Sequence, residues 1–163
     1  MDIKQHFNNN NPVFFCYAYM YLPTIYTFLV TFSAPPQCHI SYLQIEEGSL
    51  VYRFNCGSGE GQVWVPVDLS DGQWHRVSVE RTGRLAEIIL DDAYTAMGTA
   101  PGVHEVLNLD SEEVYFGAKV DILRNGYRDI SKGFEGCMED IRYEAFLGPL
   151  IKATATVDWE FHQ

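Results

Sequence analysis

The sequence predicts an all-β fold, an antiparallel sandwich, and three observations support this fold class. From about residue 40, apolar residues recur with the period of two that is typical of half-buried strands, not with the 3.6-residue period of a helix. Turn sequences that contain glycine interrupt this pattern at short, regular intervals. No stretch has the pattern of a long amphipathic helix, and no internal repeat is present.

The alternation and the turns predict each strand in order. In residues 49–55, for example, Leu50, Tyr52 and Phe54 occupy one face of a strand. Two longer segments, 91–102 and 119–132, are predicted to be loops. The predicted strands span residues 49–55, 62–67, 74–81, 85–91, 104–109, 112–117, 133–143 and 153–162.

The stretch "DGQWHRV", residues 71–77, contains residue types that also occur in catalytic sites. Asp71-Gly72 is a hairpin turn signal, and Trp74 then begins a strand as a large apolar anchor. His75 lies on the face of the valines, which favours a packed or rim histidine over a catalytic one, and Arg76 points the other way. The stretch is interpreted as architecture.

Composition limits the function classes. Among 163 residues, 47% are hydrophobic and the net charge is -11, with 22 acidic and 11 basic residues. This charge argues against a nucleic-acid partner, which requires clustered lysine and arginine. It is compatible with calcium binding and with solubility outside cells.

Residues 1–37 are predicted to form an apolar leader, separate from the domain at 38–163. No charged residue occurs between Lys4 and Glu46, and residues 13–32 are long enough to cross a bilayer, which requires about 20 apolar residues. Two interpretations stay open: a signal or membrane-anchor segment, and an artefact of the gene model.

Cysteine usage is uninformative by itself. The chain has four cysteines, at positions 16, 38, 56 and 137, and no CxxC, so a structural zinc site is not expected. Three of the four fall within residues 38–163, so at least one of them has no partner there, and their pairing stays open.

Four segments together resemble the laminin G-like domain of laminins, neurexins and sex-hormone-binding globulin. They are "GSLVYRFNCGSGEG", "VDLSDGQWHRVSVERTG", "VLNLDSEEVYFGA" and "GFEGCMEDIRY", in that order. The combination of D-G-x-W-H-x-V with a later G-F-x-G-C-x-x-D-I is specific, and the resemblance covers about residues 39–151. In character the match is similar to the laminin G-like domains of large cadherins of the neural-cadherin-like, Fat and flamingo types.

The resemblance implies a jelly-roll (concanavalin-like) sandwich of two antiparallel sheets, an extracellular or cell-surface setting, and a role as a binding module of a cadherin-type adhesion protein. The partner implied is an extracellular protein or glycan, and homophilic binding stays open. Contact with a membrane is expected only through the parent protein or residues 13–32. Residues 1–37 do not resemble the first strands of the family, so the sandwich is expected to lack them. Cys137 is expected to be a disulfide cysteine whose partner is absent from this chain.

The resemblance also implies a Ca²⁺ site on the rim of the sandwich. Its side-chain amide falls at Asn108 and its backbone carbonyls at Val106 and Cys56, and oxygen ligands of this kind suit a hard cation. The acidic ligand falls at His39, although imidazole is a poor ligand for calcium. The acidic residues considered as substitutes are Asp110, Glu60 and Asp92. The alternative is that Asn108 caps a turn and the rim binds no ion.

Two other function classes are weighed against adhesion. A jelly-roll glycoside hydrolase would need two facing carboxylates, but Asp140, Arg142 and Glu144 share a strand face with the arginine between the acids, so no catalytic residue is expected. No motif of a serine hydrolase, zinc protease or nucleotide-binding enzyme occurs.

A small secreted protein that binds carbohydrate or steroid is the other alternative. Trp64 and Trp74 are better explained as core or strand residues, whereas Tyr94 and Tyr127 lie in the predicted contact loops. The basic pair in residues 81–84 is interpreted as a solvated hairpin, not as a heparin-binding patch.

Overall fold

The computed structural model describes residues 3–4, 13–21, 27–34, 39–107, 113–116, 137–146 and 152–157. All regular structure in these ranges is β-strand. The strands are β1 (Ile3–Lys4), β2 (Val13–Tyr21), β3 (Thr27–Ala34), β4 (His39–Glu46), β5 (Ser49–Cys56), β6 (Glu60–Val65), β7 (Trp74–Thr82), β8 (Leu85–Leu90), β9 (Tyr94–Thr99), β10 (Glu113–Phe116), β11 (Cys137–Phe146) and β12 (Lys152–Val157).

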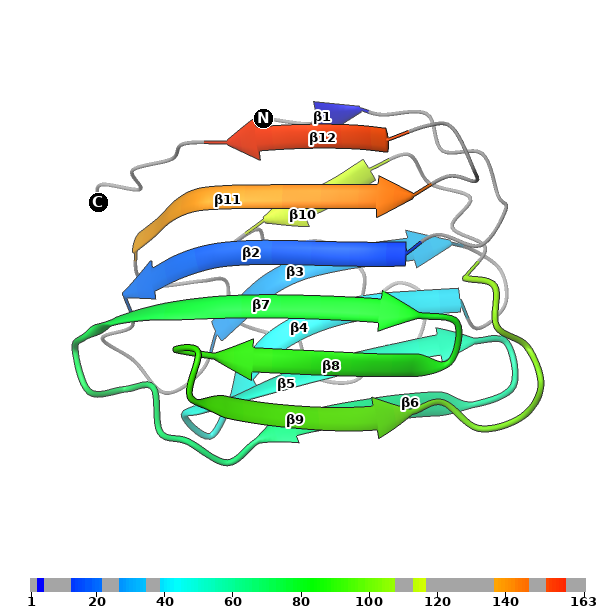
Figure 1. Cartoon of the computed structure of the whole chain (residues 1–163), viewed down its shortest axis with the longest axis horizontal. Helices are drawn as coiled ribbons and strands as arrows, with labels where there is room; N and C mark the ends of the chain where they lie inside the picture. Colours follow the sequence, from blue (N-terminus) through cyan, green and yellow to red (C-terminus); the bar gives the residue numbers. More distant parts are fainter. Residues whose placement is uncertain are drawn as a thin grey trace.

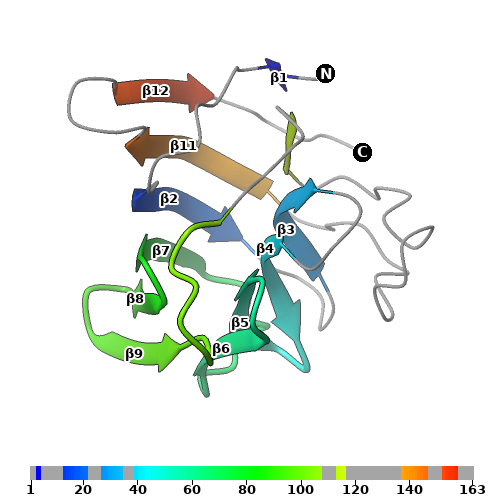
Figure 2. The same ribbon diagram turned by 90° about the vertical axis from the view of Figure 1, so that its right-hand side faces the viewer.

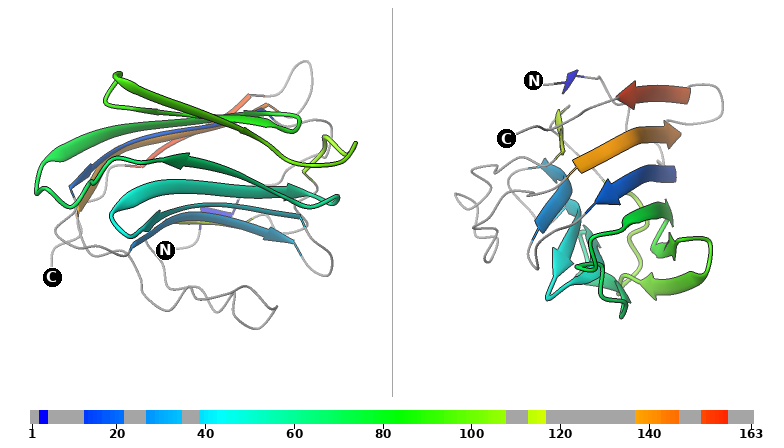
Figure 3. Two further views of the ribbon diagram at one scale, coloured as in Figure 1. Left: turned by 90° about the horizontal axis from the view of Figure 1, so that it is seen from below. Right: turned by 90° about the vertical axis from the view of Figure 1, so that its left-hand side faces the viewer.

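The strands form two six-stranded sheets that lie face to face. One sheet has the order β1-β10-β3-β4-β5-β6 and the other has the order β12-β11-β2-β7-β8-β9 (Figure 1). Neighbouring strands pair in antiparallel register, and the two curved layers are visible edge-on in Figures 2 and 3. The predicted antiparallel sandwich is therefore confirmed.

The core lies between the sheets and follows the alternation of the sequence. In β7, inward positions from His75 to Arg81 are buried while Trp74, Arg76 and Ser78 are not. Burial of apolar side chains removes them from water, which is the main favourable term in folding. The buried cluster contains Leu43, Ile45, Leu50, Tyr52, Phe54, Cys56, Val63, Val65, Leu69, Val77, Val79, Ala86, Ile88, Leu90, Ala100 and Met138.

The expectation that the sandwich lacks its first strands is wrong. β2 lies between β11 and β7, and β3 lies between β10 and β4, so residues from 13–34 supply an inner strand to each sheet. These strands were missed because their sequence is a continuous apolar run with no visible period of two. Such a run is equally compatible with a buried strand and with a buried or membrane-spanning helix. Whether residues 1–37 also act as a signal or anchor segment is a separate prediction that the fold does not test.

No helix in the described ranges is long and apolar enough to cross a membrane. The described parts of residues 13–32 are strands.

Two further elements differ from the sequence prediction, and a third is not described. Residues 94–99, predicted as part of a loop, form the edge strand β9, and the described residues of the predicted strand at 104–109 lie outside any strand. β9 was missed because its inward positions are Ala96 and Gly98, so no apolar alternation marks it. The predicted loop at 119–132 lies outside the described residues.

The two sheets approach closely where β9 lies over β6. A Cβ atom on Gly98 would overlap the backbone carbonyl oxygen of Gln62, and one on Gly61 would lie 2.7 Å from the Cα and N atoms of Ala100. Backbone atoms cannot rotate away as a flexible side chain can, so only glycine fits at these two positions. The glycines thereby let the sandwich close along this side.

We expect Gly98→Ala to lower the free energy of unfolding by about 1–3 kcal/mol, because the added methyl group forces the two backbones apart. Denaturant unfolding followed by circular dichroism measures the change. Thr95→Ala, in the same strand but with an exposed side chain, is the matched control and should change stability by no more than about 0.5 kcal/mol. Equal stability of wild type and Gly98→Ala would contradict the close approach.

Candidate functional site

Four segments meet at one end of the sandwich, on the right in Figure 1, and form what we call the rim: the end of β5, residues 57–59, the β7–β8 turn and residues 101–107. The Sγ atom of Cys56 lies 3.8 Å from the carbonyl oxygen of Gly83 in the β7–β8 turn. The hydroxyl of Ser58 lies 2.7 Å from Nδ1 of His104. The rim therefore joins segments that are distant in the sequence.

The β5–β6 turn is held by its own side chains. The Oδ1 atom of Asn55 accepts hydrogen bonds from the backbone N–H of Gly57, at 2.7 Å, and of Gly59, at 3.2 Å. An asparagine that caps two backbone donors in this way defines the conformation of the turn. Gly59 also packs so closely against Pro101 that a Cβ would lie 2.6 Å from its Cγ atom, which fixes residues 101–107 beside the turn.

Arg81 is fully buried at the centre of the rim. Its Nη1 atom donates to the carbonyl oxygen of Gly83 and to that of Glu105, the latter at 3.4 Å, and lies 3.9 Å from Sγ of Cys56. The expected solvated hairpin is therefore wrong at this residue. The sequence carries a signal that was overlooked, because Arg81 continues the inward series of His75, Val77 and Val79.

The environment of Cys56 is typical of a structural thiol. Burial raises the pKa of Cys56, and the nearby Arg81 guanidinium opposes that rise without cancelling it. A buried thiol with a raised pKa is a poor nucleophile, because the thiolate is the reactive form. The chemistry of this residue favours packing over catalysis.

The structure brings together part of the predicted calcium set. His39 pairs directly with Cys56 across β4 and β5, and Val106 follows Glu105, whose carbonyl receives the hydrogen bond from Arg81. Asn108 and Asp110 lie outside the described residues. Among the described residues no group of three or more histidine, cysteine or carboxylate side chains is placed to hold a metal. Carboxylates are present at the described rim, on Glu105 and on the neighbouring Glu60, but the expected acidic position holds His39, so the predicted ligand set itself contributes no carboxylate.

The two described acidic substitutes lie at opposite ends of the sandwich. Asp92 lies in the β8–β9 turn, at the opposite end of the sandwich from Cys56, and forms an ion pair with Arg76. Glu60 does lie at the rim, at the start of β6, but its Oε1 atom is 3.5 Å from Nε of Arg53.

Sequence reasoning missed the exposed side chains of the rim. Val103 is 83% exposed, and His104 is exposed while its ring contacts Ser58. Isolated exposed valines need no explanation, but this one lies in a segment fixed by the contacts of Pro101 and Arg81. The only signal in the sequence was the pair of turn residues at 101–102, which place the segment on the surface.

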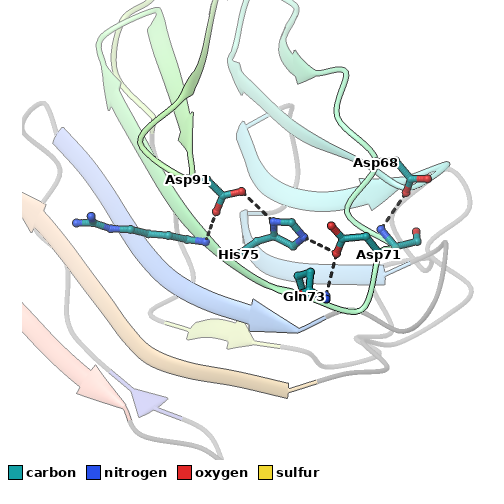
Figure 4. Close-up of polar contacts among 7 residues, drawn as sticks. Asp68, Asp71, Gln73, His75 and Asp91 are labelled. Carbon is teal, nitrogen blue, oxygen red and sulfur yellow. Dashed lines mark hydrogen bonds and ion pairs between the residues drawn. The ribbon is translucent and has the colours of Figure 1, made fainter.

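At the other end of the sandwich, His75 lies between two carboxylates (Figure 4). Its Nδ1 atom is 2.9 Å from Oδ2 of Asp91, and its Nε2 atom is 3.0 Å from Oδ1 of Asp71. Asp91 also accepts the backbone N–H of Arg76, and Asp71 that of Gln73. The prediction of a packed histidine is confirmed, since the residue is 7% exposed.

The carboxylates control the charge of this histidine. Burial by itself lowers the pKa of His75, but hydrogen bonds and charge attraction from Asp91 and Asp71 outweigh it and hold the pKa above its usual value. The pKa of Asp71 is lowered, first by the hydrogen bond from the N–H of Gln73 and also by His75. Through its two ring nitrogens the imidazole links the turn before β7 to the turn after β8.

The aromatic candidates are exposed but do not form one platform. Trp64 is 55% exposed on β6 and Trp74 is 47% exposed on β7, so both are strand residues, as expected, but neither is a core residue or an apolar anchor. They belong to different sheets. Tyr94 is 51% exposed, yet it opens β9 at the end opposite the rim. Tyr127 lies outside the described residues.

The acidic stretch on β11 differs from its prediction. One extra residue is inserted relative to β2 between Glu139 and Arg142, and Asp140 has a positive φ of 49°. A bulge of this kind breaks the period of two, so Asp140 does not share a face with Arg142 by simple alternation.

The thiol of Cys137, at the start of β11, is free and half-buried. A disulfide to a cysteine outside this chain stays a prediction.

Residues 28–145 match the family model of the laminin G domain, and the chain belongs to this family. It is 42% identical over 105 residues to the Fat-like cadherin-related tumor suppressor homolog of Drosophila melanogaster and 45% identical over 107 residues to protocadherin Fat 1 of Homo sapiens. These alignments cover 61% and 62% of this chain but 2% of each relative. The predicted resemblance to laminin G domains of large cadherins is confirmed.

Solved structures support the same fold. Domains LG4-5 of the mouse laminin alpha1 chain match with a TM-score of 0.76 and 13% identity, over 99% of this chain and 44% of that one. At this identity the likeness shows the jelly-roll sandwich alone.

We expect His75 to make stability depend on pH. Its folded pKa is raised, so its contribution is complete below the unfolded pKa of about 6.5 and is lost as the pH rises through the folded pKa. The stability difference between wild type and His75→Gln, measured by urea unfolding between about pH 5 and pH 9, should shrink as the pH rises. A difference that stays constant or grows with pH would contradict the bridged imidazolium.

Proposed function

We propose that this laminin G domain is an extracellular binding module of a cadherin-type cell-adhesion protein and that the rim is its contact surface. The observation that carries the proposal is the identity of 42–45% to two Fat cadherins over a stretch of more than 100 residues. Because the chain spans 2% of those relatives, the role of the whole protein is part of the proposal. The ligand class is an extracellular protein or glycan, and homophilic contact belongs to the same proposal.

The geometry of the rim supports a binding role. A surface segment that is already rigid loses little conformational entropy when a partner binds it, and exposed apolar side chains on it supply contact area. Residues 101–107 are such a segment, because Pro101 packs on Gly59 and Arg81 binds the carbonyl of Glu105. Val103 projects from it with 83% of its surface exposed.

The two alternative classes receive less support. Sugar-binding sites commonly use exposed aromatic rings, but Trp64, Trp74 and Tyr94, which are exposed, lie on three different strands of two sheets. For catalysis, the bulge at Asp140 separates the acidic residues of β11. A binding module therefore remains the proposal, and catalysis is not part of it.

We expect Val103→Glu to reduce the adhesion of cells to a surface coated with the full 163-residue chain to about a tenth of wild type, since a charge at the centre of an interface is costly. Gln73→Glu adds the same charge at the exposed turn on the opposite end and is the matched control. A count of adherent cells, with the thermal melt of each variant beside it, is the measurement. Equal loss of adhesion in both variants would sink the assignment to the rim.

Calcium assistance is a second part of the proposal. The ion would be held by the carbonyls of Val106 and Cys56 and by the side chain of Asn108, with His39 at the expected acidic position. Two observations bear on its strength: the expected acidic position holds His39, which pairs with Cys56, and the buried Arg81 guanidinium lies beside Cys56. Few ligand charges mean weak binding, so the expected dissociation constant is about 0.1–1 mM, as in extracellular modules.

We expect the melting temperature to rise when about 5 mM calcium replaces EDTA, because an ion that binds only the folded state stabilises it by mass action. Asn108→Ala should abolish the rise without changing the melt in EDTA. Magnesium is the control ion. A melt that is the same in calcium and in EDTA would retire the metal and leave the adhesion proposal intact.

A further inference from the structure

The edge strand β9 offers a second surface, which runs from Tyr94, at the end opposite the rim, to Thr99, two residues before Pro101. It is the last strand of its sheet and pairs with β8 on one side only (Figure 1). Within the ranges that the structure describes, no strand pairs with its other side. Its sequence, YTAMGT, has no charge and no proline, which are the usual devices that protect an edge from another strand.

The phase of the β8–β9 ladder shows which backbone groups point to the open side. The N–H of Ala100 donates to the carbonyl of Arg84 at 2.8 Å, so these two residues form a hydrogen-bonded pair. Every second pair along the ladder is of the same kind, which includes Gly98 with Ala86 and Ala96 with Ile88. In an antiparallel ladder the residues between such pairs direct their N–H and C=O groups to the other side. The open edge therefore consists of the backbone groups of Thr95, Met97 and Thr99.

The same three residues carry exposed side chains. Met97 is 64% exposed, and Thr95 and Thr99 are exposed, while Ala96 and Gly98 lie inward. Leu85, which pairs with Thr99 and is 49% exposed, extends the apolar surface onto β8. An extended segment placed along β9 would therefore meet open backbone hydrogen-bonding groups and exposed side chains at the same residues, which are every second residue of the strand.

The charges beside β9 are negative. Glu87 pairs with Met97 on one side and with Glu80 on the other, so two carboxylates lie directly opposite each other. Like charges in this position are destabilising. The nearby cations are engaged elsewhere: Arg76 pairs with Asp92, and Arg84 donates to the carbonyls of Ala100 and Gly102.

We propose that β9 is a docking site for an extended, basic segment of a partner protein, which adds as a further strand to this sheet. A lysine or arginine opposite Met97 would lie two strand spacings, about 9.5 Å, from Glu87, a gap that the two side chains span together. This inference goes beyond the proposed function, because the surface is the sheet edge and not the rim.

A second copy of this chain fits the edge less well. Pairing β9 with β9 of another copy would bring the acidic surfaces around Glu80 and Glu87 together, on chains that each carry a net charge of -11. A basic partner removes the repulsion that a second copy would add.

The probe is a synthetic ten-residue peptide of alternating lysine and valine, with blocked ends, added to the full 163-residue chain. Binding is followed by fluorescence anisotropy, and amide hydrogen exchange is read residue by residue by NMR. We expect new protection at Thr95, Met97 and Thr99, whereas Ala96 and Gly98 are already protected by β8. Added salt should weaken binding, because exposed charges are screened.

Met97→Pro is the decisive variant, since it removes an N–H on the open side and no hydrogen bond to β8. It should weaken peptide binding about tenfold, the effect of one lost hydrogen bond with its acceptor left unpaired. Met97→Thr keeps the N–H and is the matched control, with binding expected within about twofold of wild type. If Met97→Pro melts early, the same peptide with its amides methylated along one edge tests the same hydrogen bonds on the wild-type chain.

Charge variants test the choice of partner. Glu87→Gln should weaken binding about threefold, whereas Glu47→Gln, in the β4–β5 turn of the other sheet, should leave it unchanged. Equal binding of a glutamate–valine peptide, or absence of new protection at Thr95, Met97 and Thr99, would overturn the proposal. So would self-association that Met97→Pro abolishes, because it would assign the edge to a second copy. Val103→Glu should bind the peptide as wild type does. The proposal about the rim and the proposal about the β9 edge are therefore tested independently, and one can be contradicted without the other.

Discussion

The buried guanidinium of Arg81 is the interaction on which the rim depends. It contacts its own hairpin at Gly83, the end of β5 at Cys56 and the crossing segment at Glu105. A cation taken out of water must keep hydrogen bonds to oxygen, and the planar fork of an arginine can serve several acceptors at once. Residues 101–107 form no strand, so this cation and the packing of Pro101 replace the ladder that would otherwise hold them.

Each end of the sandwich buries a basic side chain, and the two ends satisfy its hydrogen bonds with different acceptors. At the rim a cation is held by neutral carbonyl oxygens, whereas at the other end the imidazole of His75 is held between Asp71 and Asp91. Carbonyls do not titrate, so the rim is insensitive to pH through this contact. The carboxylate pair responds to the protonation of the histidine, so this contact makes stability depend on pH.

The sequence was sufficient for the strands whose inward positions are large and apolar, such as β5, β7 and β8, and for the packed role of His75. It was insufficient for β2 and β3, where continuous apolar residues hide the period of two, and for β9, where Ala96 and Gly98 leave no apolar signal. Arg81 was misjudged because its charge suggested solvent, although its place in the alternation indicated the core. The exposure of Val103 depends on contacts between distant segments, which no local pattern reports.

The position of β2 has a consequence for the order of folding. In its sheet it pairs Tyr21 with Trp74 on one side and Val13 with Phe146 on the other. Both pairings close long loops, and contacts of high sequence separation slow the folding of a chain. During synthesis β2 leaves the ribosome before β7 and β11, which are its two neighbours in the sheet. Until β11 arrives, the apolar strand β2 has an open edge, and the chain is exposed to aggregation during that interval.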